Sequence, residues 1–316
     1  MRALAAAGLV ALALAGCGGG ASTAPAPAAA ATAASARRAA RPARPALCRR
    51  LTARIAGHVA TSAATELSGL VLSRTQPGVL WTENDSGNPN HVFAVRADGS
   101  LLADVTVTGS QNIDWEDIAL GRLPGGGAAL LLADIGDNLA QRAFVSVYRV
   151  PEPHVAGAAG AQIATPPAAR IDLRYPDGPR DAETLLVDPA SGAFVVVSKS
   201  FSGRSGIYVA QRPVPGAPIA MRRSGGLSLG VGEAVTGGDV SADGRTIALR
   251  TYDRVYVWRR RSGESVAAAL RHRSCSPPND LLGEGQGEAL GLTRDGGAFY
   301  TVPEGTRPAI RRYAPG

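Results

Sequence analysis

Short runs of apolar residues recur in the same order along the chain, roughly once every 50 residues, between residues 66 and 316. Each repeat has an acidic or polar residue, a first strand-like run, a turn, a second run, a gap and a third run rich in Val and Tyr. No window of about 12 residues shows the apolar spacing of an amphipathic helix. The five copies predict first strands at 66–72, 115–120, 182–187, 239–241 and 288–292, second strands at 77–81, 129–134, 194–198, 246–251 and 298–302, and third strands at 92–95, 145–150, 207–210, 255–258 and 310–313.

Turns and a fourth run complete the repeat. The segments 188–192, 242–244 and 294–297 carry the Asp, Pro and Gly residues of tight hairpin connections. A fourth strand is expected at 101–107, 169–174, 217–222 and 265–270. Short strands with this period predict an all-β fold, a β-propeller built from four-stranded blades. Five blades agree with the five copies, and a sixth blade within the long connection 152–181 is the alternative.

The fifth repeat lacks a fourth strand, whereas an apolar run at 51–59 precedes the first repeat. We expect this N-terminal run to supply the missing outer strand and to close the ring, which would remove an open sheet edge. Apart from Cys17, the chain has two cysteines, Cys48 and Cys275. In an exported protein this pair predicts a disulfide between the closing strand and the end of the fourth blade, and two separate thiols are the alternative.

Residues 1–16 have the composition of an export signal. Arg2 precedes an apolar stretch of about 14 residues, which is too short for a membrane-spanning helix. The stretch ends in Leu14-Ala15-Gly16-Cys17, which resembles the bacterial lipobox. The resemblance implies that the signal peptide is removed and that Cys17 is lipidated; an ordinary signal peptide with a chance cysteine is the alternative.

Residues 17–47 consist largely of Ala, Pro, Gly, Ser, Thr and Arg, a composition that predicts a disordered tether. A single propeller domain is expected at 48–316. We therefore expect an exported protein that is anchored by lipid to the outer face of the cell membrane, on the periplasmic side if there are two membranes.

The distribution of charge argues against nucleic acid as a partner. The formal net charge is +7, but residues 1–65 hold eight Arg and no acidic residue, so the rest of the chain carries 25 basic and 26 acidic residues. A nucleic-acid-binding domain is expected to carry a basic patch interleaved with aromatic side chains on its fold. The nearly neutral repeat region does not have this composition.

Four segments, at 112–119, 134–138, 236–241 and 285–289, resemble those of a family of exported bacterial β-propeller proteins. This resemblance extends over residues 62–316 and implies the propeller fold without implying a particular reaction. More loosely, the chain resembles WD40-like and phytase-like propellers. The phytase-like resemblance implies calcium held by acidic residues of the channel and phosphate held by basic ones.

Acidic residues recur where the first strand of each repeat begins. Because the first strand of a blade is the innermost, these side chains are expected to converge at one mouth of the central channel. A second set of charged residues follows each second strand. We assign both sets to a ligand-binding mouth formed by Glu66, Asp85, Asp114, Glu116, Asp117, Glu183, Lys199, Asp239, Arg250, Glu288 and Glu304.

Carboxylates crowded around a narrow opening raise one another's proton affinity unless a cation lies among them. Calcium is the expected cation, because it accepts about six to eight oxygen ligands in loose geometry. Asp134, Asp137 and Asn138 are the best candidate ligands, with Asp85 and Asp117 assisting. The alternative is a structural ring, in which each acid accepts backbone N–H groups of a neighbouring strand and the basic residues neutralise it.

Two classes of function remain. The four His lack the HExxH spacing of a zinc protease and no GxSxG nucleophile motif occurs, which favours a binding or scaffold module. Its channel mouth would recognise a small anionic ligand or a protein loop. The alternative is a calcium-dependent hydrolase, phytase-like or lactonase-like, in which Asp134, Asp137 and Glu116 hold the metal while Lys199 and Arg250 hold the anionic substrate.

Overall fold

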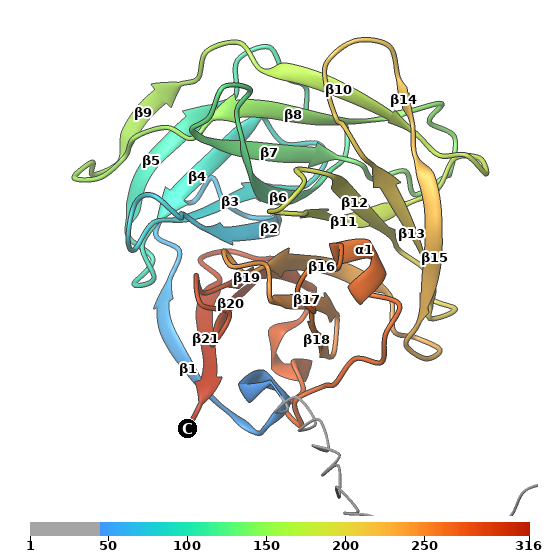
Figure 1. The fold of residues 1–316 in the computed structure, drawn as a ribbon. Helices are drawn as coiled ribbons and strands as arrows, with labels where there is room; N and C mark the ends of the chain where they lie inside the picture. Colours follow the sequence, from blue (N-terminus) through green and yellow to red (C-terminus); the bar gives the residue numbers. More distant parts are fainter. Residues whose placement is uncertain (1–44) are drawn as a thin grey trace, which may run out of the picture. The chain divides into compact units, whose positions relative to one another are not determined.

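A computed structural model describes residues 45–316. The predicted signal peptide, the lipidated Cys17 and the tether up to residue 44 lie outside the described residues and stay predictions. Within 45–316 the chain forms five β-sheets around a central axis (Figure 1). This arrangement confirms the predicted five-bladed, all-β propeller.

Each blade begins at an inner strand and adds antiparallel strands outward. Blade 1 consists of β2 (Leu67–Leu72), β3 (Leu80–Asn84), β4 (His91–Val95) and β5 (Leu101–Thr106), and blade 2 of β6 (Trp115–Arg122), β7 (Ala128–Asp134), β8 (Val145–Pro151) and β10 (Ala169–Arg174). Blade 3 contains β11 (Ala182–Val187), β12 (Phe194–Ser198), β13 (Arg204–Ala210) and β15 (Arg222–Ser228), and blade 4 contains β16 (Val235–Val240), β17 (Thr246–Thr251) and β18 (Val255–Arg259). Blade 5 consists of β19 (Gly287–Leu292), β20 (Phe299–Pro303), β21 (Ala309–Pro315) and β1 (Leu51–His58). The inner strands β2, β6, β11, β16 and β19 contact one another around the ring.

The long connection 152–181 does not form a sixth blade. Its first strand, β9 (Ala161–Ala164), pairs in parallel with β5 at the outer edge of blade 1. Its second strand, β10, pairs with β8 as an outer strand of blade 2. The six-blade alternative is therefore wrong, because this segment extends two existing blades.

The ring is closed by β1, as the apolar run at 51–59 predicts. β1 pairs antiparallel with β21, from Leu51 opposite Pro315 to His58 opposite Ala309. A 3₁₀ turn, η1 (Ala46–Cys48), precedes it, and Cys48 forms the predicted disulfide with Cys275, whose Cα lies 5.7 Å away. The N-terminal strand is thus the outermost strand of the last blade and is covalently joined to the segment after blade 4.

Two predicted outer strands are wrong. Residues 265–270 form the helix α1 (Val266–Ala269), because Ser265 caps its first turn by accepting a hydrogen bond from the Ala268 N–H, and alanine favours a helix. Within 217–222, β14 (Ile219–Ala220) pairs with β10 of blade 2, and Arg222 is the first residue of β15. The outer strand of blade 3 is β15, and the sheet of blade 4 has three strands.

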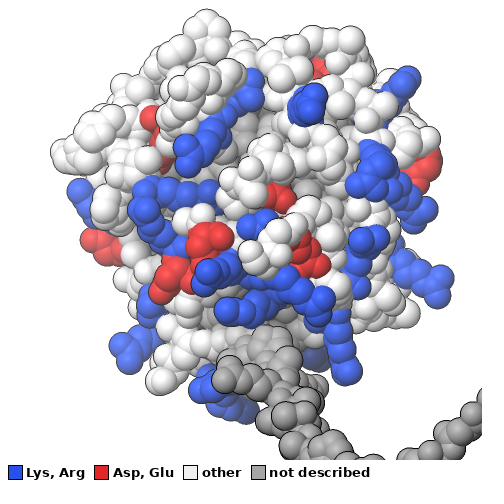
Figure 2. Space-filling view, in the orientation of Figure 1, with Lys and Arg blue, Asp and Glu red and all other residues white. Residues whose placement is uncertain are grey.

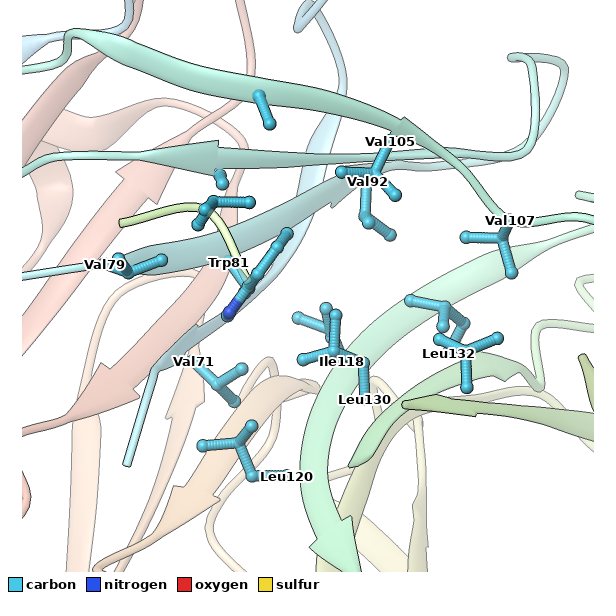
Figure 3. Packing of buried hydrophobic residues seen from close by; sticks show 14 of the residues in the cluster. Val71, Val79, Trp81, Val92, Val105, Val107, Ile118, Leu120, Leu130 and Leu132 are labelled. Atoms are coloured by element: carbon cyan, nitrogen blue, oxygen red, sulfur yellow. The ribbon is translucent and has the colours of Figure 1, made fainter. Parts of the chain in front are cut away.

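Apolar side chains fill the space between each pair of adjacent blades. Between blades 1 and 2, Trp81 and Val105 point toward Ile118 and Leu130, and all four are buried (Figure 3). Similar clusters occupy the other four junctions. Each buried side chain of this kind contributes roughly 1.5–3 kcal/mol, so the packing fixes the inner strands around the channel.

Helices are few and short. Besides α1 and η1, the described residues form only η2 (Leu282–Glu284). No helix within 45–316 is long and apolar enough to cross a membrane.

Candidate functional site

Every inner strand carries a β-bulge near its beginning. In blade 2, for example, the register with the second strand shifts between Trp115 and Asp117. A bulge leaves a residue without a partner on the next strand and re-aims its side chain. In blade 1 the shift spans Ser68 and Gly69, and in each other blade it spans a single residue. The bulge residues with side chains, which we call the bulge ring, are Ser68, Glu116, Glu183, Thr236 and Glu288.

The bulge ring brings carboxylates from three blades together. Glu116, Glu183 and Glu288 are buried, and each offers an oxygen atom within 4.8 Å of the other two. Ser68 completes the ring in blade 1, because its Oγ donates to the Glu116 carbonyl oxygen (2.7 Å) and lies 3.3 Å from Glu288 Oε2. In blade 4 the ring position is occupied by Thr236, whose Oγ1 donates to the Gly287 carbonyl oxygen (3.3 Å).

A second layer of carboxylates lies where the second strands end. Asp85 and Glu304 directly follow β3 and β20, and their oxygen atoms lie within 4.8 Å of one another and of Glu288. Asp85 also approaches Asp114 and Glu116 within the same distance. The two layers form one continuous group, which we call the acidic cluster: Asp85, Asp114, Glu116, Glu183, Glu288 and Glu304.

One cation accompanies the acidic cluster. Among residues 45–316, Lys199 is the only basic residue that forms an ion pair with a member of it, Glu183. The Lys199 ammonium lies 5.6 Å from the centroid of the Tyr252 ring and 6.0 Å from that of Phe201. These rings are nearly parallel, and Phe201 is 61% exposed. An aromatic surface therefore borders the acidic cluster beside its only paired cation.

Burial and repulsion from neighbouring carboxylates raise the pKa values of four members of the acidic cluster. Burial, with added repulsion from neighbouring carboxylates, raises the pKa of Asp85 and of Asp114 to about 6 and that of Glu304 to about 7. The pKa of Glu116 rises well above its usual value for the same two reasons. Without a further cation, these carboxyls therefore release their protons at a higher pH than exposed carboxyls do.

The backbone at Gly136 makes room for two of these carboxylates. A Cβ atom at this position would lie 2.3 Å from Glu116 Oε1 and 2.4 Å from Asp114 Oδ2. The Gly136 N–H also donates to the Asp114 carbonyl oxygen (3.1 Å). Glycine is needed here because a side chain would displace both carboxylates.

Two further acids lie near the site, although the sequence analysis did not select them. Glu83 on β3 is buried against Gly69, and neither carboxylate oxygen has a hydrogen-bond partner of good geometry. Burial and then repulsion from Asp85 raise its pKa to about 8. Asp181 precedes β11 as Asp114 precedes β6, and its charge helps to raise the pKa of Asp114. The signal for Glu83 is an acid two residues after the apolar run of the second strand, at 79–81.

Three of the acids predicted for the mouth lie outside the acidic cluster. Asp117 Oδ2 accepts the Leu185 N–H of blade 3 (2.8 Å), and Asp239 Oδ2 accepts the Leu292 N–H of blade 5 (2.9 Å). These two acids join adjacent blades, as the structural alternative expects. Glu66 is exposed and accepts a hydrogen bond from the Asn88 side chain.

Arg250 is enclosed by protein groups. Its side chain is fully buried, and Nη1 donates to Glu284 Oε2 (3.3 Å) and to the Ala289 carbonyl oxygen (3.0 Å). The residue that directly follows β17 is Tyr252, whose hydroxyl donates to Glu288 Oε1 (3.3 Å). Because protein groups surround the buried Arg250 side chain, it is not placed to contact an external anion, contrary to the expectation.

The residues predicted as the best calcium ligands are engaged within the loop after β7. Asp134 Oδ1 pairs with Arg142 (2.8 Å), and the Asp137 carboxylate accepts the N–H groups of Gln141 and Arg142 (2.8 and 2.9 Å). Asn138 is exposed. The structure does not bring these three residues into the acidic cluster, and a guanidinium group already neutralises Asp134.

No protein-family model matches the chain, and no curated protein matches its sequence. Among solved structures, the chain is similar to a gluconolactonase from Xanthomonas campestris, with 14% sequence identity and a TM-score of 0.47, over 86% of this chain and 93% of that one. Similarity at this level carries no information about the site.

Proposed function

We propose that the protein is an exported, lipid-anchored β-propeller whose channel mouth binds calcium and, through the bound ion, an external ligand. The main support is the acidic cluster, in which six carboxylates meet beside one lysine. Glu183 adds to it, because its Oε2 is buried without a hydrogen-bond partner. Such an atom destabilises the fold unless an ion or water satisfies it.

The chemistry of the donor atoms favours a hard cation. The candidate groups contain only carboxylates, without His or Cys, and oxygen ligands suit calcium better than zinc. Asp85, Glu288 and Glu304 would hold an ion at the outer level of the mouth. Glu116, Glu183 and Glu288 would hold one at the level of the bulge ring.

The rim of the mouth indicates which ligand would reach the ion. Lys199 supplies a positive charge, and the exposed ring of Phe201 supplies an apolar surface next to it. An anionic ligand would therefore contact calcium and Lys199 with its oxygen atoms and Phe201 with its apolar part. A carboxylate-bearing protein loop offers the same chemistry.

Calcium titration of the full chain tests this proposal. We expect saturable binding in calorimetry, and a rise in melting temperature that a chelator reverses. Glu183→Gln should weaken binding about tenfold or more. Asp253→Asn, which alters an exposed acid outside the acidic cluster, is the matched control and should bind as the wild type does. Folded wild-type protein without saturable calcium binding would contradict the proposal.

The lipid anchor is tested separately through Cys17. Wild-type protein should sediment with the membrane fraction, whereas Cys17→Ser should appear in the soluble exported fraction. Membrane attachment that persists in Cys17→Ser would show that another segment holds the protein there.

A calcium-dependent hydrolase of lactones or phosphoesters is the second candidate, and the titration of two carboxyls favours it. Asp85, with a pKa of about 6, and Glu304, with a pKa of about 7, would exchange protons near neutral pH. Calcium, when bound, would polarise the carbonyl or phosphoryl oxygen of a substrate. Whichever of these two carboxylates does not contact the ion would then accept the proton of an attacking water.

Turnover distinguishes the two candidates. A hydrolase should cleave a lactone or a phosphoester in the presence of calcium, and Glu304→Gln should lose turnover more than calcium binding. Calcium binding without turnover on either substrate class would support the binding module.

A further inference from the structure

A cleft between blades 1 and 5 lies at the opposite end of the propeller from the acidic cluster. It has a volume of 330 Å³ and opens beside the turns that join β2 to β3 and β19 to β20. The acidic cluster lies at the other end, where inner strands begin and second strands end. The cleft has an apolar part, formed by residues that include Leu72, Leu80 and Tyr300, and a basic part formed by Arg74, Arg294 and Arg312.

The basic part of the cleft is not neutralised by the protein. No carboxylate lines the cleft, and among residues 45–316 none of its three arginines forms an ion pair. The charges of Arg74 and Arg312 reach Asp239 and Asp295. The Asp239 carboxylate accepts the N–H groups of Val240 and Leu292, and the Asp295 carboxylate accepts hydrogen bonds from Thr293 and Gly297 within its own turn. The cleft therefore keeps a net positive charge.

A fourth arginine extends this charge across blade 5. Arg54 on β1 lies directly opposite Arg312 on β21, and Arg312 lies opposite Tyr300 on β20. Directly opposite residues project from the same face of a sheet, and like charges in this arrangement destabilise it. An anion bound beside them would relieve that repulsion.

Two of the arginines are held in place by backbone groups. Arg74 Nη2 donates to the Val240 carbonyl oxygen (2.8 Å), and Arg294 Nη1 donates to the Arg74 carbonyl oxygen (2.9 Å). A guanidinium has about five N–H donors, so others remain for a ligand. Pre-positioned guanidinium groups suit phosphate, because each can bind two of its oxygen atoms.

We propose that this cleft binds the phosphate group of a phosphate ester, independently of the channel mouth. The phosphate lies among Arg74, Arg294 and Arg312, and the organic part of the ester lies against Leu72 and Tyr300.

The basic surface around this end of the propeller supports the proposal. In Figure 2, Lys and Arg side chains outnumber Asp and Glu side chains on the face that carries α1 in Figure 1. This is the turn end of the propeller, because the Val266 N–H of α1 donates to Asp188 in the turn after β11. Such a surface attracts anions toward the cleft.

Phosphate of this kind has two sources, a soluble ester or the headgroup of an anionic phospholipid. The phospholipid headgroup is the source that agrees with the predicted lipid anchor, because β1, which carries Arg54, is the first strand after the predicted tether. Both sources present the same group to the arginines.

The test uses the full chain with Cys17→Ser, so that no lipid anchor contributes to binding. Glycerol 3-phosphate is titrated by calorimetry, and flotation is measured with vesicles of phosphatidylglycerol and of phosphatidylcholine, all in the presence of a chelator. We expect saturable binding to glycerol 3-phosphate, to phosphatidylglycerol vesicles or to both, weakened about tenfold by Arg312→Gln with Arg294→Gln. Arg122→Gln is the matched control, because Arg122 is an exposed arginine at the end of β6 and lies outside the cleft.

Each outcome decides the proposal. Binding of glycerol 3-phosphate supports a soluble ester, whereas binding confined to phosphatidylglycerol vesicles supports a headgroup. If Arg122→Gln weakens binding as much as the cleft variant does, general surface charge explains the effect and the proposal is overturned. The absence of binding to both probes would also overturn it. Arg312→Gln alone serves if the double variant does not fold, because Arg312 is exposed.

Discussion

The backbone of Gly136 and the carboxylate of Glu116 are so close that no side chain fits between them, since a Cβ atom at Gly136 would lie 2.3 Å from Glu116 Oε1. Gly136→Ala should therefore displace the carboxylates of Glu116 and Asp114 and weaken calcium binding about tenfold, as measured by calorimetry. Gly283→Ala is the matched control, because a Cβ atom there meets no neighbour within 4 Å. Equal affinities for the two variants would place the metal site elsewhere.

The stability of the calcium-free protein should fall as pH rises. Between about pH 4 and pH 7, Asp85, Asp114 and Glu304 retain protons in the folded state that the unfolded state has already released. Unfolding then releases protons, so the free energy of unfolding decreases with increasing pH. Calcium competes with these protons, so its affinity should increase over about pH 5.5 to pH 7.5. Melting curves with chelator and with calcium across this range check both trends, and parallel curves would contradict them.

Glu83→Gln should stabilise the protein at about pH 8 and change little at about pH 4. The buried Glu83 carboxyl has no hydrogen-bond partner of good geometry and a pKa of about 8, whereas the unfolded chain releases this proton above the ordinary pKa of 4.5. Between these two pKa values each pH unit lowers the free energy of unfolding by about 1.4 kcal/mol, which glutamine avoids, and above about pH 8 the loss stays constant. Urea unfolding at about pH 4 and pH 8 measures the difference. The same shift at both pH values would show that packing, and not ionisation, causes it.

Removal of the Cys48–Cys275 disulfide should lower the free energy of unfolding by about 2–5 kcal/mol without preventing ring closure. Closure persists because β1 still pairs with β21, and Asn279 binds both the N–H and the carbonyl oxygen of Leu51 (2.7 and 2.9 Å). Denaturant unfolding of Cys48→Ser with Cys275→Ser, compared with reduced wild-type protein, checks this. If the denaturant midpoint of the double variant lies well below that of the reduced wild-type protein, the two cysteine side chains stabilise the fold in a way that does not require the disulfide.

The repeated strands, the closing strand and the disulfide could be predicted because each depends on a local pattern: apolar runs, turn residues and the number of cysteines. Outer strands were less predictable. The segment at 265–270 is apolar enough for a strand, but the Ser265 cap and consecutive alanines make it a helix. At the outer edge of a blade, the helix propensity of a segment competes with strand pairing. The sequence alone does not show whether a neighbouring strand is available to pair with.

Placement of side chains at the channel mouth depends on the bulges, which the sequence does not reveal. Alignment by acidic residues selects Glu66 in blade 1, yet Ser68 occupies the bulge there. Likewise, Arg250 lies two residues before the position that faces the mouth, which Tyr252 occupies. Glu116 and Asp117 are adjacent in sequence, but one joins the acidic cluster and the other binds the backbone of blade 3. A shift of a single residue thus separates a candidate ligand from a structural contact.

The pairing of β1 with β21 would also set the order of folding events during the proposed export. If the N-terminus crosses the membrane first, β1 emerges before any other strand of the domain, but its partner β21 is the last strand to follow. Blade 5 and its covalent link to Cys275 therefore cannot be completed until nearly the whole chain has been translocated. Until then, β1 and its partner-free edge depend on chaperones or on the growing ring for protection from aggregation.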